Sequence, residues 1–163
     1  MADDAKSLFV LENDVFKVYL TYAVLVVFKM MFLSFYTATI RISSKLILQS
    51  FANKEDFGPG YPEDKAAEKI AKGNPKIDRI RRCHLNDLEN IPAFLIVGLL
   101  YVAINPSLYT ATMHYRIFAA ARYFHCVAYL LPLPQPSRAL AFGTGATVTI
   151  SMGVQILRAA AQF

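Results

Sequence analysis

Residues 79–101 read R-I-R-R-C-H-L-N-D-L-E-N-I-P-A-F-L-I-V-G-L-L-Y, a polar run that continues into an apolar run with no turn signal between them. Arg82, Asn86 and Glu89 recur at i, i+4 and i+7, a spacing that places side chains on one face of a helix. Charged and amide groups at membrane depth are costly unless they find partners. The stretch therefore predicts a long helix that carries a buried polar site towards lipid.

The rest of the chain also indicates a membrane protein. Of its 163 residues, 55% are hydrophobic, which is high for a soluble domain of this length. The apolar residues gather in four segments, each able to supply the roughly 20 residues of a spanning helix. The turns N-P-S and P-L-P-Q-P-S are short and join antiparallel neighbours. We therefore predict an all-α fold: an integral membrane four-helix bundle, up-down-up-down, in a single domain with spans at about 15–42, 79–104, 108–133 and 138–158.

Charge predicts the orientation of this bundle. Nine Lys or Arg residues lie between Lys45 and Arg82, whereas the amino terminus is net acidic and shows no A-x-A cleavage site. By the positive-inside rule, the loop at about 45–78 is cytosolic and the first span acts as a signal anchor. The net charge of +5 is then mainly an orientation signal, and nothing points to nucleic acid.

The third predicted span carries a second polar and aromatic stripe. Its members recur at i, i+3, i+7, i+10 and i+14: Tyr115, Phe118, Arg122, His125 and Tyr129. Two interpretations stay open. Arg122 neutralises Glu89 or Asp87 and the histidines His84 and His125 are structural, or the stripe belongs to a binding site.

Four arginines are expected near the same end of the bundle: Arg41, Arg82, Arg122 and Arg138. Arginine keeps its charge when buried, and its planar fork suits carboxylates. The surplus of positive charge predicts a small anionic ligand with carboxylate groups. Snorkelling to lipid headgroups remains the alternative for Arg41 and Arg138. Lys29, in the middle of the first span, is expected to pair with an acid or a helix dipole.

Motifs of soluble enzymes are absent from the chain. There is no G-x-S-x-G elbow, P-loop, dinucleotide fingerprint or H-E-x-x-H. The two cysteines, Cys83 and Cys126, lie on predicted helices, and neither their number nor their spacing indicates a disulfide framework or a metal site. Chemistry would have to be performed on a bound thiol or lipid.

Several polar sequence motifs resemble those of a known family. R-I-R-R-C-H-L-N-D-L-E-N, F-A-N-K-E-D at 51–56, A-R-Y-F-H-C-V-A-Y-L at 121–130 and L-P-L-P-Q-P-S-R-A-L at 131–140 are similar to motifs of the membrane-associated proteins in eicosanoid and glutathione metabolism. Within that family they resemble the type-1 branch of the microsomal glutathione transferases. The resemblance covers nearly the whole chain.

The resemblance implies a homotrimer in the endoplasmic reticulum membrane, and also in the outer mitochondrial membrane, with glutathione as co-substrate and no metal. It places glutathione between subunits near the cytosolic face. The implied pocket residues are Arg41, Arg82, His84, Asn86, Glu89, Arg122, His125, Tyr129 and Arg138. Arg138, supported by Tyr129, would hold the thiolate.

The implied activity is detoxification by conjugation of glutathione to hydrophobic electrophiles, together with reduction of lipid hydroperoxides. A glutathione-dependent prostaglandin or leukotriene synthase is the first alternative. The prostaglandin E synthase branch has serine where this chain has Ala139, which argues against that isomerase. A non-catalytic lipid-binding scaffold is the second alternative. A small channel or transporter is the third.

Overall fold

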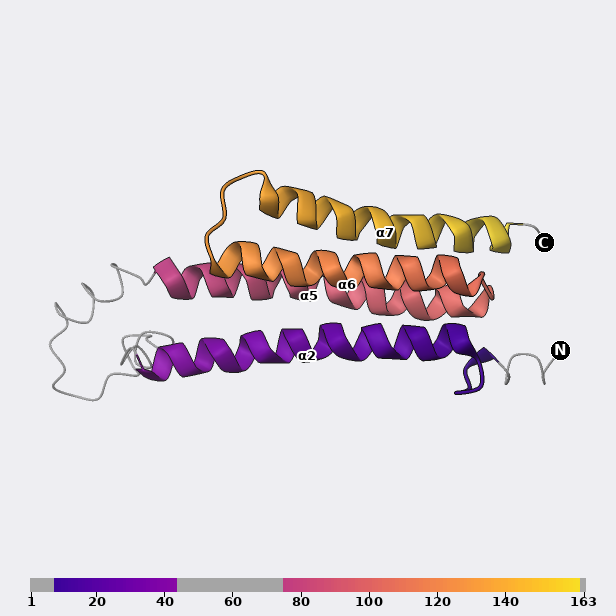
Figure 1. The fold of residues 1–163 in the computed structure, drawn as a ribbon, viewed down its shortest axis with the longest axis horizontal. Coiled ribbons are helices and arrows are strands. Elements are labelled where there is room, and N and C mark those ends of the chain that lie inside the picture. The colour runs from indigo at the N-terminus through magenta and orange to yellow at the C-terminus, as the bar shows by residue number, and fades with distance from the viewer. Residues whose placement is uncertain (1–7, 44–74, 162–163) are drawn as a thin grey trace, which may run out of the picture.

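The computed structural model describes residues 8–43 and 75–161, and these residues form four long helices. The helices are α2 (Asp14–Ser43), α5 (Pro75–Ala103), α6 (Leu108–Leu130) and α7 (Ser137–Ala160). They run alternately up and down along one long axis (Figure 1). The predicted all-α, four-helix architecture is confirmed. Most of the predicted loop at 45–78 lies outside the described residues, and its last part belongs to α5.

Local chemistry explains where these helices begin and end. The side chain of Asn13 accepts a hydrogen bond from the Val15 amide at 3.0 Å and so caps the start of α2. Ser107 caps α6 in the same way through the Thr110 amide. Asn105 turns the chain between α5 and α6 with a φ of 47°, a left-handed conformation that asparagine tolerates better than most residues. Pro92 lies inside α5, which continues through it.

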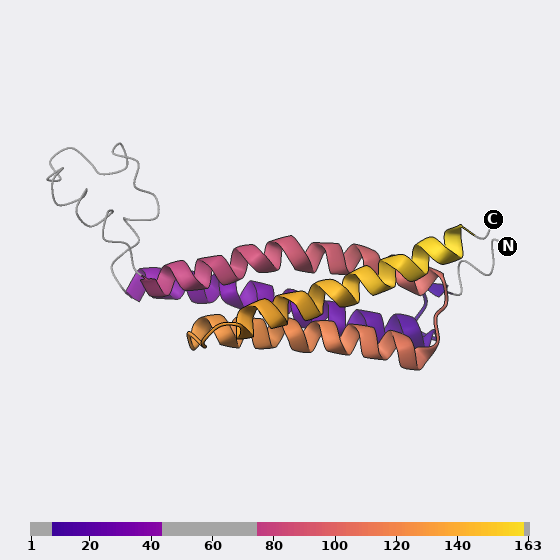
Figure 2. The ribbon, with the colours of Figure 1, turned by 90° about the horizontal axis from the view of Figure 1, so that it is seen from above.

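Three helices are long and apolar enough to cross a membrane: Asp14–Ile40, Lys76–Ala103 and Ser137–Ala160. The helix α6 is not among them, because its 23 residues include two arginines and two histidines. It lies between its neighbours, packing against α2, α5 and α7. Figure 2 shows α7 crossing obliquely, starting over α6 and ending over α5. Arg122 and His125 of α6 are buried among these helices, whereas Arg116 is exposed.

The bundle has two ends with different chemistry. We call the end where α2 stops and α5 starts the Ser43 end, and the opposite end, with the α5–α6 turn, the Asn105 end. The larger buried cluster fills the Asn105 half and is built from residues such as Phe94, Tyr115, Phe118 and Met152. A smaller cluster at the Ser43 end consists of Leu33, Ile80, Cys83 and Cys126. The ionic residues lie between these two clusters.

Candidate functional site

Three charged side chains meet in the bundle interior: Lys29 of α2, Asp87 of α5 and Arg122 of α6. Lys29 Nζ donates to both carboxylate oxygens of Asp87, at 2.7 and 2.6 Å. Arg122 donates to Asp87 Oδ1 from Nη2 at 2.6 Å and from Nε at 3.2 Å. At most 5% of each residue is exposed. Two cations share one carboxylate, so this ion cluster carries a formal net charge of +1.

The ion cluster also resolves two alternatives left by the sequence. Arg122 is neutralised by Asp87, whereas Glu89 is exposed. Lys29 does find an acid, and it is the same one. Arg122 Nη2 donates further to Asn86 Oδ1 at 2.7 Å, and Asn86 is only half-buried. Arg122 therefore links the buried charges to the polar face of α5.

A second group of polar residues joins the end of α6 to the start of α7. The rings of His125 and Tyr129 lie 4.9 Å apart between centroids. The guanidinium carbon of Arg138 lies 5.0 Å from the centroid of the Tyr129 ring, within the range of a cation–π contact. The structure thus brings together Tyr129 and Arg138, the two residues expected to be catalytic.

Buried nitrogen atoms without partners are concentrated at the Ser43 end. Among the described residues, the buried side-chain N and O atoms that lack a hydrogen bond are His84 Nδ1, Arg122 Nη1, His125 Nδ1 and Arg138 Nε. Folded proteins leave few such atoms, and each needs an explanation. Arginine nitrogens only donate, and a histidine nitrogen donates or accepts according to its tautomer. All four atoms belong to residues predicted for the ligand site, and together they suit a ligand rich in acceptors.

Two predicted residues point elsewhere within this single chain. Arg82 and Glu89 are exposed on α5, on a face that is turned away from the buried stripe Ile80, Cys83 and Asp87. Asn86 lies between the two faces. Arg41 belongs to α2, but its side chain lies outside the described part of the structure. The predicted set therefore divides into Arg82 and Glu89, which face outward on α5, and an inward group on α6 and α7. His84 and Asn86 of α5 are half-buried.

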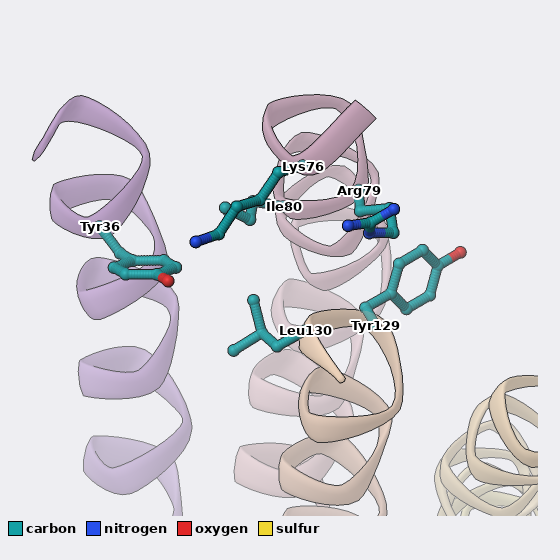
Figure 3. A pocket seen from close by; sticks show the side chains of 6 residues that line it. All are labelled: Tyr36, Lys76, Arg79, Ile80, Tyr129 and Leu130. Carbon is teal, nitrogen blue, oxygen red and sulfur yellow. The ribbon is translucent and has the colours of Figure 1, made fainter. Parts of the chain in front are cut away.

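A pocket of about 190 Å³ opens at the Ser43 end, between α2, α5 and α6. It is lined by Tyr36, Lys76, Arg79, Ile80, Tyr129 and Leu130. Figure 3 shows Lys76 extending from α5 towards Tyr36 of α2, and Arg79 beside the ring of Tyr129. The pocket is thus lined by two cationic side chains, Lys76 and Arg79, together with the apolar residues Ile80 and Leu130.

Sequence reasoning missed part of this arrangement. It treated Asp87 only as a counterion, although Asp87 is the residue on which both buried cations converge. It did not single out Tyr36, Lys76 or Arg79 as site residues. The sequence feature that could have identified Asp87 is its position directly after Asn86 in the polar run of α5. Within residues 8–43 and 75–161, no three His, Cys, Asp or Glu side chains group closely enough to hold a metal ion.

The fold and the site define a multi-pass helical membrane protein with a net positive, donor-rich polar end. The chain belongs to the MAPEG family, whose sequence profile matches residues 19–158. It is 48% identical over 148 residues to microsomal glutathione S-transferase 1 of Mus musculus, covering 91% of this chain and 92% of that protein. Its identity to the Homo sapiens protein of the same name is 44% over 152 residues, covering 91% and 93%. Prostaglandin E synthase of Homo sapiens is 32% identical over 157 residues, covering 94% and 95%.

Proposed function

We propose that this protein is a membrane glutathione transferase that binds glutathione at the Ser43 end and activates it as a thiolate. The observation that carries the proposal is the set of four buried, unpartnered nitrogens on His84, Arg122, His125 and Arg138. Glutathione presents two carboxylates and two amide carbonyls, which are the acceptors such nitrogens require. Relatives at 44–48% identity carry the name of a glutathione transferase.

Arg138 and Tyr129 are the proposed catalytic pair. Only the thiolate form of a thiol is nucleophilic. Lowering a thiol pKa from about 8.5 to about 6.5 requires about 2.7 kcal/mol of preferential stabilisation of the anion. A guanidinium and a phenol hydroxyl beside the sulfur can supply that amount in a partly dry site. The contact between Arg138 and Tyr129 supports their action on one atom.

The other predicted residues would bind the rest of the tripeptide. Arg41, Arg82 and His125 are proposed to hold its carboxylates, whereas Asn86 and Glu89 would meet its amine and amides. His84 and Arg122 are proposed as adjacent donors. Arg122 is already held by Asp87 through Nη2 and Nε, and its Nη1 remains for the ligand.

The site is proposed to be completed by neighbouring copies in a homotrimer. Arg82 and Glu89 lie on an outward face of a membrane-capable helix, and charged groups facing lipid are costly. A second copy against this face would join them to its own Tyr129 and Arg138. The mass of the complex in a detergent micelle measures the number of copies, and a monomeric, active protein would contradict this arrangement.

The thiolate sulfur would attack the electrophilic carbon of a substrate dissolved in the bilayer, forming a thioether and expelling the leaving group where there is one. With a lipid hydroperoxide it would attack the peroxide oxygen, releasing an alcohol, and a second glutathione would then yield glutathione disulfide and water. We place this activity at the cytosolic face of the endoplasmic reticulum membrane, with the outer mitochondrial membrane as a further location. The basic composition of 45–82 supports the cytosolic placement.

Ultraviolet difference absorbance at the thiolate band, recorded as glutathione is added to the detergent-purified protein, tests the proposal. We expect an absorbance rise in the unmodified protein and none in Arg138→Leu. Turnover of an aromatic halide should fall by about 10²–10³-fold, the usual effect of removing one preorganised donor. Arg158→Leu is the matched control, because Arg158 is an exposed arginine at the far end of the same helix.

An unchanged thiolate signal and turnover in Arg138→Leu would remove Arg138 from the catalytic role. Glutathione binding with no thiolate signal would favour the alternative, a glutathione-dependent eicosanoid synthase, which the 32% identity to prostaglandin E synthase keeps in view. Isomerisation of prostaglandin H2, measured beside conjugation, separates the two enzymes. Absence of glutathione binding would favour a lipid-binding scaffold.

A further inference from the structure

The two cysteines of the chain, which the sequence left unconnected, are neighbours in the fold. Cys83 of α5 and Cys126 of α6 belong to the same small buried cluster. Both thiols are free and buried, with 0% of Cys83 and 7% of Cys126 exposed. The chain contains only these two cysteines. Packing has therefore made a dithiol from two residues that lie on different helices.

The register between α5 and α6 holds this pair in place. Cys83 precedes Asp87 by four residues on α5, and Cys126 follows Arg122 by four residues on the antiparallel α6. Four residues are close to one helical turn, so the thiols lie one turn beyond the Asp87–Arg122 ion pair along the same contact line. That ion pair, 2.6 Å long and fully buried, prevents the two helices from sliding past each other. The two cysteines consequently stay at the same level of the α5–α6 contact.

Positive charge lies close to the pair. The ion cluster of Lys29, Arg122 and Asp87 lies one turn away and carries a formal net charge of +1. Nearby cations stabilise the thiolate form of a cysteine over the thiol form. Tyr129, Leu130 and Tyr36 pack on the cluster that contains both cysteines, and the same three residues line the pocket at the Ser43 end (Figure 3). Side chains that line the pocket therefore also cover the dithiol.

We propose that Cys83 and Cys126 form a redox-active dithiol, which an organic hydroperoxide oxidises to a disulfide between α5 and α6 and which glutathione reduces again. Cys126, the more exposed residue, reacts first. Its thiolate attacks the terminal peroxide oxygen, forming an S–O bond while the O–O bond breaks, and the alkoxide leaves and takes up a proton to become an alcohol. Cys126 is then a sulfenic acid.

Cys83 resolves this intermediate. Its thiol attacks the Cys126 sulfur, an S–S bond forms, and the S–O bond breaks as hydroxide leaves with the thiol proton as water. The hydroperoxide is reduced by two electrons and the two thiols are oxidised by two. Two glutathione molecules reverse the reaction by thiol–disulfide exchange, releasing both cysteines and one glutathione disulfide. Disulfides that face a reducing compartment are usually transient and redox-sensing, as this cycle requires.

The disulfide would act on the neighbouring polar site. An S–S bond of about 2.05 Å holds two sulfur atoms closer than a non-bonded contact does, so oxidation would change how α5 and α6 pack at this level. The contact between Arg122 and Asn86 lies one turn away on the same two helices. Oxidation of the dithiol would thereby change the positions of residues proposed to bind glutathione.

The experiment uses the full-length protein in detergent, treated with tert-butyl hydroperoxide without glutathione, then denatured, alkylated and digested for mass spectrometry without reductant. We expect the loss of both alkylation sites, a peptide joined through Cys83 and Cys126, and no covalent dimer on a non-reducing gel. Adding glutathione should restore both alkylation sites. Because the chain has only two cysteines, any disulfide within it must be this one.

Two variants keep the test decisive. Cys83→Ala should accumulate a sulfenic acid on Cys126 that dimedone traps, whereas Cys126→Ala should leave the fully buried Cys83 unmodified over the same time. Two alkylatable thiols after treatment of the unmodified protein, a disulfide only between chains, or oxidation only to sulfinic acid would each overturn the proposal. The measurement of the disulfide needs no turnover of glutathione. The dithiol proposal can therefore be contradicted while the proposed transferase activity stands, and the reverse.

Discussion

The Asn105 half and the Ser43 half of the bundle treat their buried polar groups in opposite ways. In the Asn105 half, the Tyr19 and Tyr115 hydroxyls donate to the carbonyl oxygens of Leu95 and Gly98, at 2.9 and 3.0 Å. Tyr101 donates to Gln155 at 2.8 Å, and both ring nitrogens of His114 have partners. Helices gain little from apolar contact alone in lipid, so such bonds and close packing must hold this half together.

The Ser43 half contains strong ion pairs next to buried nitrogen atoms that have no hydrogen-bond partner. Asp87 binds two cations, but one buried nitrogen each of His84, His125 and Arg138 has no partner. Nη1 of Arg122, within the ion cluster itself, has none either. The comparison teaches that one half is built for stability and the other keeps hydrogen-bonding capacity for something outside the single chain. Three substitutions test this division, from the largest expected effect to the smallest.

Replacing Asp87 with Ala should cause the largest loss of stability. Lys29 and Arg122 would remain buried with no counter-charge, and breaking a buried ion pair on one side costs about 3–5 kcal/mol. The midpoint of thermal unfolding in detergent measures the loss. Asp14→Ala is the control: its salt bridge with Lys17 leaves both side chains more than half exposed, so the cost should stay below about 1 kcal/mol. Equal, small effects of the two changes would show that the ion cluster is not structural.

Replacing Gly98 with Ala should have an intermediate effect. A Cβ there would lie 3.1 Å from the Tyr19 ring and 3.4 Å from the Tyr115 ring. Both rings are held by their hydroxyl bonds, so the overpacking should cost about 1–3 kcal/mol. Gly143→Ala is the matched control, with nothing within 4 Å of the new Cβ, and it should gain up to about 1 kcal/mol from helix propensity. A gain at both positions would contradict the close packing assigned to the Asn105 half.

Replacing Tyr115 with Phe should have the smallest effect on stability, about 0.6 kcal/mol, typical of a hydrogen bond between helices in a membrane protein. Turnover should not change, because the hydroxyl only joins α6 to the Gly98 carbonyl. His125→Phe is the matched change in the other half. We expect it to raise the KM for glutathione about tenfold or more, a loss of roughly 1.4 kcal/mol of binding. If Tyr115→Phe impaired turnover more than His125→Phe, the division between the two halves would be wrong.

Much of this arrangement could be predicted from particular residues. The stripe on α6 was predicted from its spacing. Its first four members, Tyr115, Phe118, Arg122 and His125, are buried, and the fifth, Tyr129, is half-buried. The polar run from Arg82 to Glu89 does continue into one helix with the apolar run behind it. Among the described residues, all four that carry unpartnered buried nitrogens belong to the predicted set. The roles of these residues in binding glutathione stay a prediction.

Other features could not be predicted, because periodicity places a residue on the face of its own helix and says nothing about which residue faces it. Both Asp87 and Glu89 were available to Arg122, and only packing shows that Asp87 is opposite. Cys83 and Cys126 looked unrelated for the same reason. The pocket residues Tyr36, Lys76 and Arg79 come from two helices whose relative height no sequence pattern specifies.

The sequence by itself determined that four helices form, that three of them are apolar enough to cross a membrane, and which family the chain belongs to. These properties depend on composition, on the spacing of residues along one helix and on short polar motifs, all of which are local features of the sequence. The tertiary structure alone decided that Lys29 and Arg122 share Asp87, that Tyr129 meets Arg138, and that two distant cysteines form a pair. Such pairings depend on the register and rotation of packed helices, which the side chains of all four helices set together.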